Sequence, residues 1–462
     1  MAEQKSSFKG TIGFVLTAAG SAVGLGNIWR FPYLAARDGG GLFLVIYVIF
    51  ALTFGFTLLT TEIAIGRKTR KSPLTAYREV KKGFGWIGIL ACIVPFLVVP
   101  YYCTIGGWVL KYFVVYVTGH GNDAPTGGYF TEFVTSAKEP VIYMAIFTVI
   151  CAFVILLGVN GGIENLSKIV MPVLVLLVIG IAIFSLTVSD VNELGKKVTG
   201  MDGLKVYLLP NLEGMTVKRV FYIAMDALGQ LFYSLSVAMG IMIAYGSYVP
   251  NDSNLVKAIG RIEIFDTLIA FLAGVMIVPA VYVFMGDGMS EQGPALMFVS
   301  LPKVFSKMGA VGNVVGALFF GMVLFAAITS AISMFEAVVS SLIDKFGMKR
   351  WKATLIEISI SLIVGFFVCA GYDSLFFDIL LPNGSHAQLL DVMDYVSNQM
   401  VIPVVAISTC ILIGWVKGAD YVIAEITKNG ESFRREKMYR IMIKYVSPVL
   451  VLILFLMALG LF

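Results

Sequence analysis

Apolar residues fill most of the chain in long runs that short polar stretches separate. Many of these runs reach the length of about twenty residues that a helix needs to cross the hydrocarbon core of a bilayer. The pattern therefore predicts an all-α membrane protein with eleven transmembrane helices. The predicted spans follow the apolar runs at 11–36, 42–66, 87–117, 141–158, 166–188, 220–248, 257–284, 312–343, 353–372, 392–416 and 441–462.

The first run is interrupted near its middle, in the stretch 20–32 (GSAVGLGNIWRFP). Its glycines weaken a helix where the bilayer offers no water to replace lost backbone hydrogen bonds. Asn27 and Arg30 add polar groups at membrane depth, and these are costly unless something binds there or pairs with them. Close packing against another helix would account for the glycines alone. A broken helix with spare carbonyls and an Asn favours a site for a desolvated cation.

A second interruption lies in the sixth run, at 230–240 (QLFYSLSVAMG), where Ser234, Ser236 and Gly240 interrupt apolar sequence. Simple kinks are the alternative interpretation. Runs one and six each begin a set of five, and an odd number of crossings gives the second set the opposite topology. The pattern thus predicts a 5+5 inverted repeat whose broken helices 1 and 6 meet at a substrate site. The predicted divisions are a first repeat (1–188), an extracellular loop (189–219), a second repeat (220–416) and a cytoplasmic loop with the eleventh helix (417–462).

Composition agrees with a membrane protein and narrows the chemistry. The chain is 58% hydrophobic and 14% charged with a mean hydropathy of +0.88, against about 45–50% and 25% in soluble domains. The five cysteines all lie in apolar segments and show no metal-binding spacing, so we expect neither a disulfide nor a metal cluster. The net charge of +5 carries no indication of nucleic-acid binding.

The distribution of charge predicts the orientation. Loop 373–390 contains no Lys or Arg, whereas the loop after the second span and the segment before the last span are basic. The positive-inside rule then places the N-terminus in the cytoplasm and, after eleven crossings, the C-terminus outside. The basic positions are Arg67, Lys68, Arg70, Lys71, Arg78, Lys81 and Lys82 in the first segment, and Lys417, Lys428, Arg434, Arg435, Lys437 and Arg440 in the second.

The motif 22–32 (AVGLGNIWRFP), with further matches in spans 2, 3, 6, 7, 8 and 10, resembles the neurotransmitter:sodium symporters, specifically their bacterial eleven-helix amino-acid transporters. The resemblance covers nearly the whole chain. It implies a Na+-coupled, chloride-independent symporter, not an enzyme, that imports a neutral hydrophobic amino acid by alternating access. The implied setting is the bacterial cell membrane, and the implied partners are the amino acid and the lipid bilayer, for a protein that functions as a monomer.

The same resemblance implies two sodium sites. Adjacent hydroxyls in a helix often bond back to their own carbonyls, yet the family pattern favours oxygen ligands for a hard cation at Thr329 and Ser330. The substrate carboxylate would complete the second site, so that substrate and Na+ strengthen each other's binding. The first set is Gly20, Val23, Ala326, Thr329 and Ser330, and the second is Ala22, Asn27, Ser234 and Asp266.

Asp266 departs from the animal pattern. Animal relatives carry Asn at this position and, four residues later, a Ser that helps to hold chloride, whereas this chain has Ala270. We therefore expect Asp266 to supply the negative charge that chloride supplies in those relatives. The alternative is a carboxylate that faces water near the cytoplasmic end of the span.

A substrate pocket follows from the same match, with the Tyr102 hydroxyl and the amides around Ser21, Ala22 and Gly26 holding the substrate carboxylate. An aromatic and methionine cluster can equally be ordinary core. Because no acid or base falls among these positions, we expect a neutral, largely apolar ligand. The remaining predicted pocket residues are Val98, Tyr233, Ser234, Ser236, Ala238, Met239, Ser330 and Met334.

Two gates are implied. Arg30 and Asp394 match the outer pair that closes above the substrate, with Tyr233 as its lid. Tyr248 and Asp344 match the inner gate of that family, whose cation is Lys5 here or, alternatively, Lys9. Lys forms a less directional pair than the forked guanidinium found in relatives. Two further intramembrane carboxylates, Glu62 and Glu336, are expected to bond unwound backbone.

Rival functions remain at this point. A proton-coupled amino-acid transporter using Glu62 or Glu336, or a transporter-like amino-acid sensor, would use a similar pocket. A channel would need a continuous polar pore, whereas these polar groups cluster at one depth. In the fifth span, Gly162 and Pro172 form the Gly-x9-Pro pattern that, in relatives, marks a segment that unwinds and admits water to the sodium site.

Overall fold

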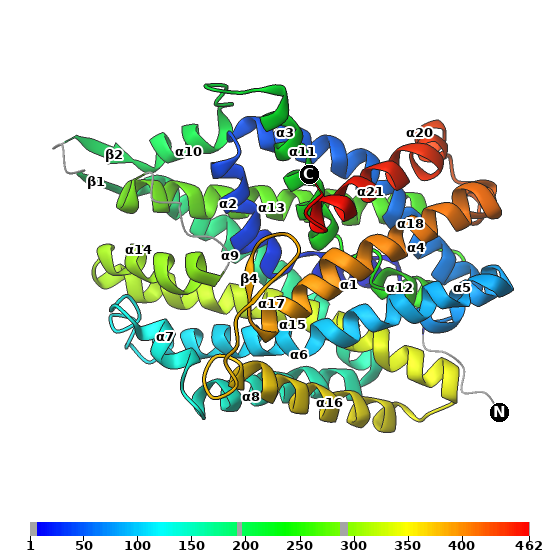
Figure 1. The fold of residues 1–462 in the computed structure, drawn as a ribbon, viewed down its shortest axis with the longest axis horizontal. Coiled ribbons are helices and arrows are strands. Elements are labelled where there is room, and N and C mark those ends of the chain that lie inside the picture. The colour runs from blue at the N-terminus through cyan, green and yellow to red at the C-terminus, as the bar shows by residue number, and fades with distance from the viewer. Residues whose placement is uncertain (1–6, 192–195, 287–293, 462) are drawn as a thin grey trace.

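The computed structural model describes residues 7–191, 196–286 and 294–461. Its long helices form one bundle, and many of them, among them α6, α8, α13, α15 and α16, run roughly along the long axis of the molecule (Figure 1). The α-helices are α1 (Thr11–Ala22), α2 (Phe31–Arg37), α3 (Gly41–Phe50), α4 (Phe56–Thr69), α5 (Pro73–Val80), α6 (Gly85–Val117), α7 (Tyr129–Val134), α8 (Glu139–Leu156), α9 (Asn165–Thr187), α10 (Gly200–Leu208), α11 (Val217–Ser234), α12 (Ile241–Tyr248), α13 (Leu255–Met285), α14 (Leu301–Lys307), α15 (Ala310–Phe346), α16 (Arg350–Ala370), α17 (Leu389–Asp394), α18 (Ile402–Ile411), α19 (Asp420–Ile426), α20 (Glu436–Ile441) and α21 (Ser447–Ala458).

Short helical turns of other types join several of these helices. In the described part of the chain, the strands form two small antiparallel pairs, β1 (Ser189–Val191) with β2 (Lys197–Thr199), and β3 (Ile379–Leu380) with β4 (His386–Ala387). The π-helical turns are Gly26–Arg30, Ala51–Gly55, Val159–Glu164, Leu296–Ser300, Tyr395–Val401, Leu412–Val416 and Met442–Val446, and one 3-10 turn spans Lys82–Phe84.

Nine helical segments of the described ranges are long and apolar enough to cross a membrane. A tenth is the pair Thr11–Ala22 and Gly26–Arg37, bent by 56° at its break. Helices α11 and α12 cover the sixth predicted span, but the non-helical residues 235–240 separate them. The predicted count of eleven spans therefore stays a prediction.

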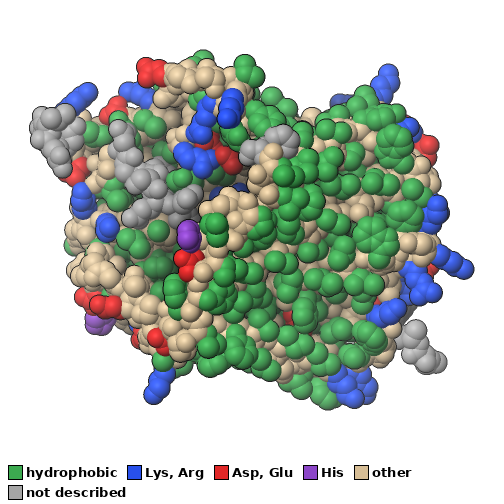
Figure 2. Space-filling view, viewed as in Figure 1, with side chains coloured by type: hydrophobic (Ala, Val, Ile, Leu, Met, Phe, Trp, Pro, Cys, Tyr) green, Lys and Arg blue, Asp and Glu red, His purple; other side chains and the backbone are tan. Residues whose placement is uncertain are grey.

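The surface has the distribution expected of a chain embedded in lipid. Hydrophobic side chains cover a broad central area of the face in Figure 2, and charged side chains gather toward its edges. Exposed apolar patches of this extent mark contact with a membrane or a partner. We call the end that carries α5, α20 and the first described residues the N-terminal end, and the end that carries β1 and β2 the hairpin end (Figure 1).

Both predicted helix breaks are present. Helix α1 ends at Ala22, Val23 is extended (φ −78, ψ 93), and helical structure resumes at Gly26. In the second break, Ser236 (φ 53) and Ala238 (φ 61) adopt the left-handed conformation. That conformation costs an L-residue about 1–2 kcal/mol, and such strain concentrates at functional sites.

Buried side chains hold the interrupted backbone in place. The Ala238 amide donates to Glu62 Oε1 at 2.6 Å, as expected for Glu62. Gln230 Nε2 donates to the Gly26 carbonyl at 3.0 Å, and Ser236 Oγ donates to the Ser21 carbonyl at 3.0 Å. Because unpaired backbone groups are costly away from water, these bonds make the two breaks a single linked unit.

Candidate functional site

A small cavity of about 40 Å³ lies between the two breaks and the facing sides of α6 and α15. The Tyr102 hydroxyl is buried beside it, close to Ser330 and the Leu25 backbone but outside hydrogen-bond geometry. This hydroxyl is thus available to a ligand. The lining residues are Ser21, Ala22, Gly24, Leu25, Gly26, Asn27, Val98, Tyr102, Tyr233, Ser236, Met239, Ser330, Met334 and Asn398.

The structure brings together every predicted pocket residue except Ser234 and Ala238. Ser234 Oγ turns away and donates to Asp266 Oδ1. Ala238 does not line the cavity, and its amide is directed at Glu62. The sequence analysis missed Asn398, which also lines the cavity. Asn398 follows Asp394 by one helical turn, and residues four apart share a helix face. This spacing was the signal in the sequence that could have indicated Asn398.

Glycine is needed where the first break approaches the cavity. A Cβ atom at Gly24 would lie 2.8 Å from Ser330 Oγ, and one at Gly26 would lie 2.4 Å from the Tyr233 ring. Any side chain at these two positions would displace groups of the site. The backbone itself is therefore part of the cavity wall, with its amides and carbonyls within reach of a ligand.

The first predicted sodium set forms one cluster, which we call the hydroxyl site. Ser330 Oγ lies 3.5 Å from the Gly20 carbonyl oxygen and 3.4 Å from that of Val23, and the Ser21 carbonyl is 3.2 Å away. Thr329 Oγ1 lies 3.1 Å from the Ala326 carbonyl oxygen. One hydroxyl carries a single proton, so it cannot bond all the carbonyls around it. A cluster of neutral oxygens of this kind suits a hard cation.

The second predicted set surrounds Asp266, and we call it the carboxylate site. Asn27 Nδ2 and Ser234 Oγ both donate to Asp266 Oδ1, at 2.9 Å and 2.7 Å. Asp266 Oδ2 is buried and accepts no hydrogen bond from any residue in the described ranges. The Tyr47 side chain also lies near Asp266, a neighbour that the sequence did not indicate. A buried carboxylate with an uncommitted oxygen needs a positive partner, and Na+ fits.

The chemistry of the site fits an alkali cation better than a transition metal. Among the residues that the structure describes, no three His, Cys, Asp or Glu side chains converge as metal ligands. The expected sodium ligands are instead hydroxyl, carbonyl, amide and single-carboxylate oxygens. Oxygen ligands without thiol or imidazole are the preference of hard cations.

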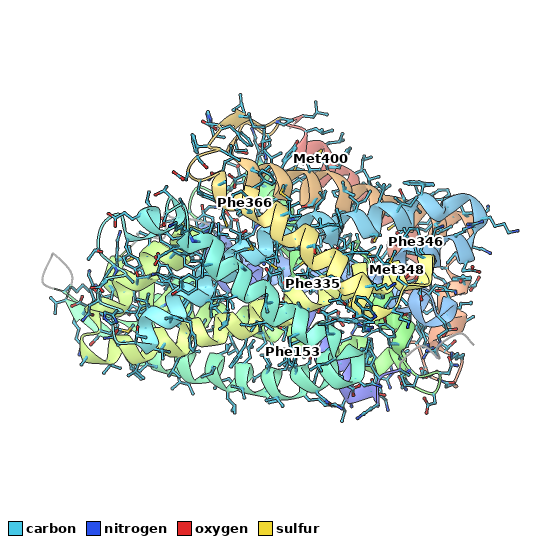
Figure 3. All side chains as sticks on the ribbon, turned by 90° about the horizontal axis from the view of Figure 1, so that it is seen from below. Phe153, Phe335, Phe346, Met348, Phe366 and Met400 are labelled. Atoms are coloured by element: carbon cyan, nitrogen blue, oxygen red, sulfur yellow. The ribbon has the colours of Figure 1, made fainter. Side chains whose placement is uncertain are left out.

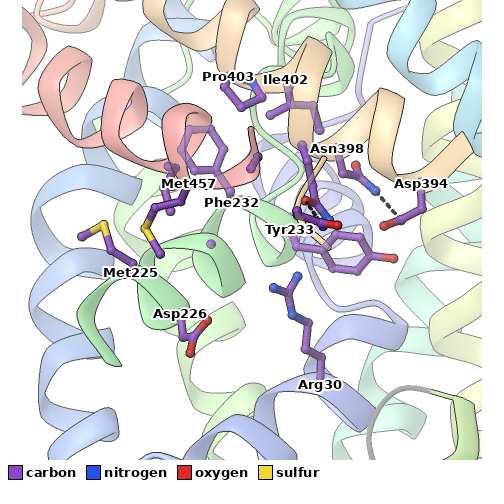
Figure 4. Close-up of a pocket in the computed structure, with 15 residues that line it drawn as sticks. Arg30, Met225, Asp226, Phe232, Tyr233, Asp394, Asn398, Ile402, Pro403 and Met457 are labelled. Carbon is purple, nitrogen blue, oxygen red and sulfur yellow. Dashed lines mark hydrogen bonds between the residues drawn. The ribbon is translucent and has the colours of Figure 1, made fainter. Parts of the chain in front are cut away.

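A cavity of about 270 Å³ lies on the hairpin side of the site, and Arg30, Tyr233 and Asp394 line it (Figure 4). Asp394 accepts hydrogen bonds from the Tyr101 hydroxyl at 3.0 Å and from Asn398 Nδ2 at 2.7 Å. Arg30 is near enough to interact electrostatically with Asp394 but is not paired with it in the described part of the chain. Figure 4 shows the Tyr233 ring between the two charges in this view. The predicted outer pair is therefore not formed in this conformation.

The N-terminal side of the site is packed closed. The Phe8 ring contacts Tyr245 and Tyr248, and the Phe8 amide donates to the Tyr248 carbonyl at 3.0 Å. The Tyr248 hydroxyl donates to Glu336 Oε1 at 2.7 Å. Arg350 binds both Glu336 oxygens, at 2.7 Å and 2.9 Å. We call these five residues the inner network.

One expectation for this region changes. Glu336 does not bond unwound backbone, because α15 carries it to the N-terminal end, where it meets Arg350 at the start of α16. Asp344 Oδ2 accepts the Ser72 amide at 2.6 Å. The predicted cation Lys5 lies outside the described residues. The alternative cation, Lys9, donates its backbone amide to Glu164 Oε2 at 3.0 Å.

The chain matches the family described as the Sodium:neurotransmitter symporter family over residues 5–122 and 132–462. It is 32% identical to the uncharacterized sodium-dependent transporter YhdH of Bacillus subtilis, over 100% of this chain and 99% of that one. It is 28% identical to the sodium- and chloride-dependent GABA transporter 2 of Rattus norvegicus, over 88% of this chain and 72% of that one.

A solved structure, that of MhsT in complex with L-phenylalanine, matches with a TM-score of 0.85 at 31% identity, covering 98% of this chain and 100% of that one. The match confirms the predicted all-α membrane fold with its two broken helices. The members of this family are transporters rather than enzymes. The chain therefore belongs to the sodium:neurotransmitter symporter family.

Proposed function

We propose that this protein is a chloride-independent symporter that couples Na+ entry to the import of a neutral, largely apolar amino acid. The observation that carries the proposal is the carboxylate site. Asp266 places a fixed negative charge, with one uncommitted oxygen, where a cation can bind without a chloride ion to balance it. Ala270 supplies neither charge nor hydroxyl for an anion, and it is fully buried.

The lining of the small cavity supports the substrate class. Among its residues, no Asp, Glu, Lys, Arg or His faces the space, so a charged substrate side chain would be left unpaired. The Tyr102 hydroxyl and the backbone around Gly24 would hold the substrate carboxylate, and Val98, Met239 and Met334 would contact the side chain. The bound phenylalanine named for the MhsT structure is a ligand of this chemical class.

We assign one Na+ to the hydroxyl site and one to the carboxylate site. In the second, the substrate carboxylate would complete the coordination together with the Ala22 carbonyl, Asn27, Ser234 and Asp266. A ligand shared by ion and substrate makes each bind more tightly when the other is present. Each charge that enters against 100 mV contributes about 2.3 kcal/mol, so ion entry can drive accumulation of the substrate.

The orientation follows from the charges at the two ends. The N-terminal end carries the basic side chains of α5 and of the segment before α20, and we place it in the bacterial cytoplasm with the C-terminus outside. The inverted repeats would then be 1–188 and 220–416, which rock against each other around the site. The transporting unit would be a single chain.

Uptake by the purified protein in proteoliposomes tests the proposal. Radiolabelled amino acids should accumulate under an imposed Na+ gradient and not under a pH gradient alone, and replacement of chloride by gluconate should leave the rate unchanged. Asp266→Asn should abolish uptake or make it respond to chloride, whereas Asp252→Asn, on an exposed loop, should have no effect. Chloride-dependent uptake by the native protein would overturn the role of Asp266, and uptake driven by protons without Na+ would overturn sodium coupling.

A further inference from the structure

Helix α16 buries a stripe of polar side chains and exposes many of its large apolar ones. Thr354, Glu357 and Ser361 lie on its buried face, at most 1% exposed. Large apolar side chains point outward instead: Trp351, Leu355, Ile356, Ile363, Phe366 and Phe367 are between 40% and 59% exposed. Figure 3 views the molecule from the side on which α8 and α16 lie, with Phe366 labelled. A buried polar stripe on a lipid-facing helix is a costly arrangement and by default marks a functional group.

Four oxygens of this stripe lack partners. All four are buried, and none makes a hydrogen bond within the described part of the chain. They are Thr354 Oγ1, both carboxyl oxygens of Glu357, and Ser361 Oγ. Neighbours three or four positions apart face each other on a helix, so both hydroxyls lie beside the carboxyl. Ser361 is the nearer partner, close to Glu357 but outside hydrogen-bond geometry.

Among the residues that the structure describes, no cation of the neighbouring helices is close enough to act on Glu357. Helix α6 places the thiols of Cys92 and Cys103 near it, and Cys151 of α8 lies next to Cys103. Helix α15 contributes Ser341, close to Cys92. The remaining neighbour, α17, carries Asp391, which lies near Tyr372, beyond the far end of α16. An ionised carboxylate here would be uncompensated, which membrane burial strongly disfavours.

We propose that Glu357 is a proton-binding site, separate from the substrate and sodium sites. A protonated carboxyl has one donor and retains acceptor capacity. It can donate to Ser361 Oγ and accept from Thr354 Oγ1, which pairs the orphaned oxygens of the stripe without any cation. The backbone of α16 is helical throughout, so the face offers no freed carbonyls to complete the shell of a metal ion.

The position of Glu357 indicates how its proton exchanges. Glu357 lies seven residues after Arg350, about 10 Å along the helix. Arg350 joins α16 to Glu336 on α15 in the inner network. When that contact opens, α16 and α15 can part at the N-terminal end, and water gains a path to the carboxyl. Proton exchange at Glu357 is therefore gated by the inner network.

Infrared difference spectroscopy on the purified full-length protein tests the site without depending on transport. The carbonyl band of a protonated carboxylic acid should be present in the native protein at neutral pH and lost in Glu357→Gln. The matched control Glu132→Gln, at an exposed position of α7, should keep it. Loss of an ionised carboxylate band in Glu357→Gln instead would overturn the proposal. A band from Glu357 that shifts when Na+ replaces K+ would overturn it in favour of a cation site.

Two further variants keep the test decisive if Glu357→Gln does not fold. Ser361→Ala removes the proposed acceptor, so the acid band should move to higher frequency, and an unmoved band would contradict the assignment. Arg350→Ala should speed hydrogen–deuterium exchange of the same band at least several-fold relative to Lys349→Ala. Equal exchange rates in these two variants would overturn gating by the inner network.

Discussion

The two sides of the substrate cavity are built differently. On the hairpin side, a cavity of about 270 Å³ separates Arg30 from Asp394, and Asp394 is held by neutral partners. On the N-terminal side, aromatic rings and the bidentate Glu336–Arg350 pair fill the space. One side is therefore closed by packing and paired charge, while the other keeps its charged groups apart. In the orientation and alternating-access mechanism proposed above, this is the arrangement of a transporter that is closed toward the cytoplasm.

The largest loss of substrate binding should come from breaking the ion pair on the N-terminal side. Glu336→Gln leaves Arg350, whose side chain is 23% exposed, without its carboxylate. Removing one partner of a fully buried pair costs about 3–5 kcal/mol, and this partly exposed pair falls at the lower end of that range. If that cost falls on the closed state, its population relative to the inward-open state drops by roughly a hundredfold or more. Na+-dependent substrate binding to the purified protein should weaken at least tenfold.

The neighbouring exposed residue provides the control for that measurement. Lys349→Gln, at the N-cap of α16, should bind substrate as the native protein does. If Glu336→Gln bound with native affinity, the ion pair would not be what holds the N-terminal side closed, and the contrast between the two sides would rest on aromatic packing alone.

On the hairpin side, a smaller effect is expected, and it should fall on uptake rather than on substrate affinity. In this conformation Asp394 accepts from Tyr101 and Asn398, and an Asn at position 394 keeps one acceptor oxygen for them. Substrate affinity should therefore change by less than about threefold in Asp394→Asn. Uptake should fall about tenfold, because closing the outer gate requires a charge opposite Arg30. Comparing equilibrium binding with the uptake rate separates the two effects, and Gln399→Ala, in the same cavity, is the control. Equal losses of binding and uptake would mean that Asp394 acts on the cavity rather than on closure.

The parts of this arrangement that the sequence predicted are those with local signals. Gly24 and Asn27 interrupt an apolar run, so the first break and its cation chemistry were visible in the chain. Thr329 and Ser330 were assigned through the family motif, and the structure brings them to the Gly20 and Val23 carbonyls.

The parts that were missed depend on tertiary geometry. Glu336 looked like a ligand of unwound backbone, because the pattern predicts a turn between the eighth and ninth spans but does not indicate that this turn brings Arg350 against Glu336. Tyr47 has no motif that links it to Asp266. The orientation of Ala238 depends on a left-handed backbone, which residue identity alone does not indicate for alanine.

The release of Na+ toward the cytoplasm gives a third test of the contrast between the hairpin side and the N-terminal side. Pro172 lies within α9, and the turn before it is a continuous helix here, with Lys168 paired to buried Glu164 at 2.6 Å. Proline removes one backbone hydrogen bond from that turn. Pro172→Ala should restore the bond and make the segment harder to open, so uptake should slow several-fold while Na+-dependent binding stays native. Val173→Ala, which faces outward, is the control. Native uptake by Pro172→Ala would exclude opening of this segment as a slow step.

The smallest effects, on stability and on substrate binding, are expected at Ala238, in the break between α11 and α12. From the sequence, Ala238 was expected to line the substrate pocket. In the structure Ala238 does not line the cavity and holds a φ of 61. Ala238→Gly relieves about 1–2 kcal/mol of left-handed strain but adds about 0.5–1 kcal/mol of unfolded-chain entropy.

The melting temperature of Ala238→Gly should therefore rise by no more than a few degrees. Competition binding with alanine, valine and phenylalanine should rank the three as in the native protein. Ser236→Gly is the informative partner, because Ser236 lines the cavity and its hydroxyl bonds the Ser21 carbonyl, so this variant should weaken all three amino acids. Selective improvement of phenylalanine in Ala238→Gly would show that the methyl group faces the substrate after all. The second break would then rearrange when substrate binds.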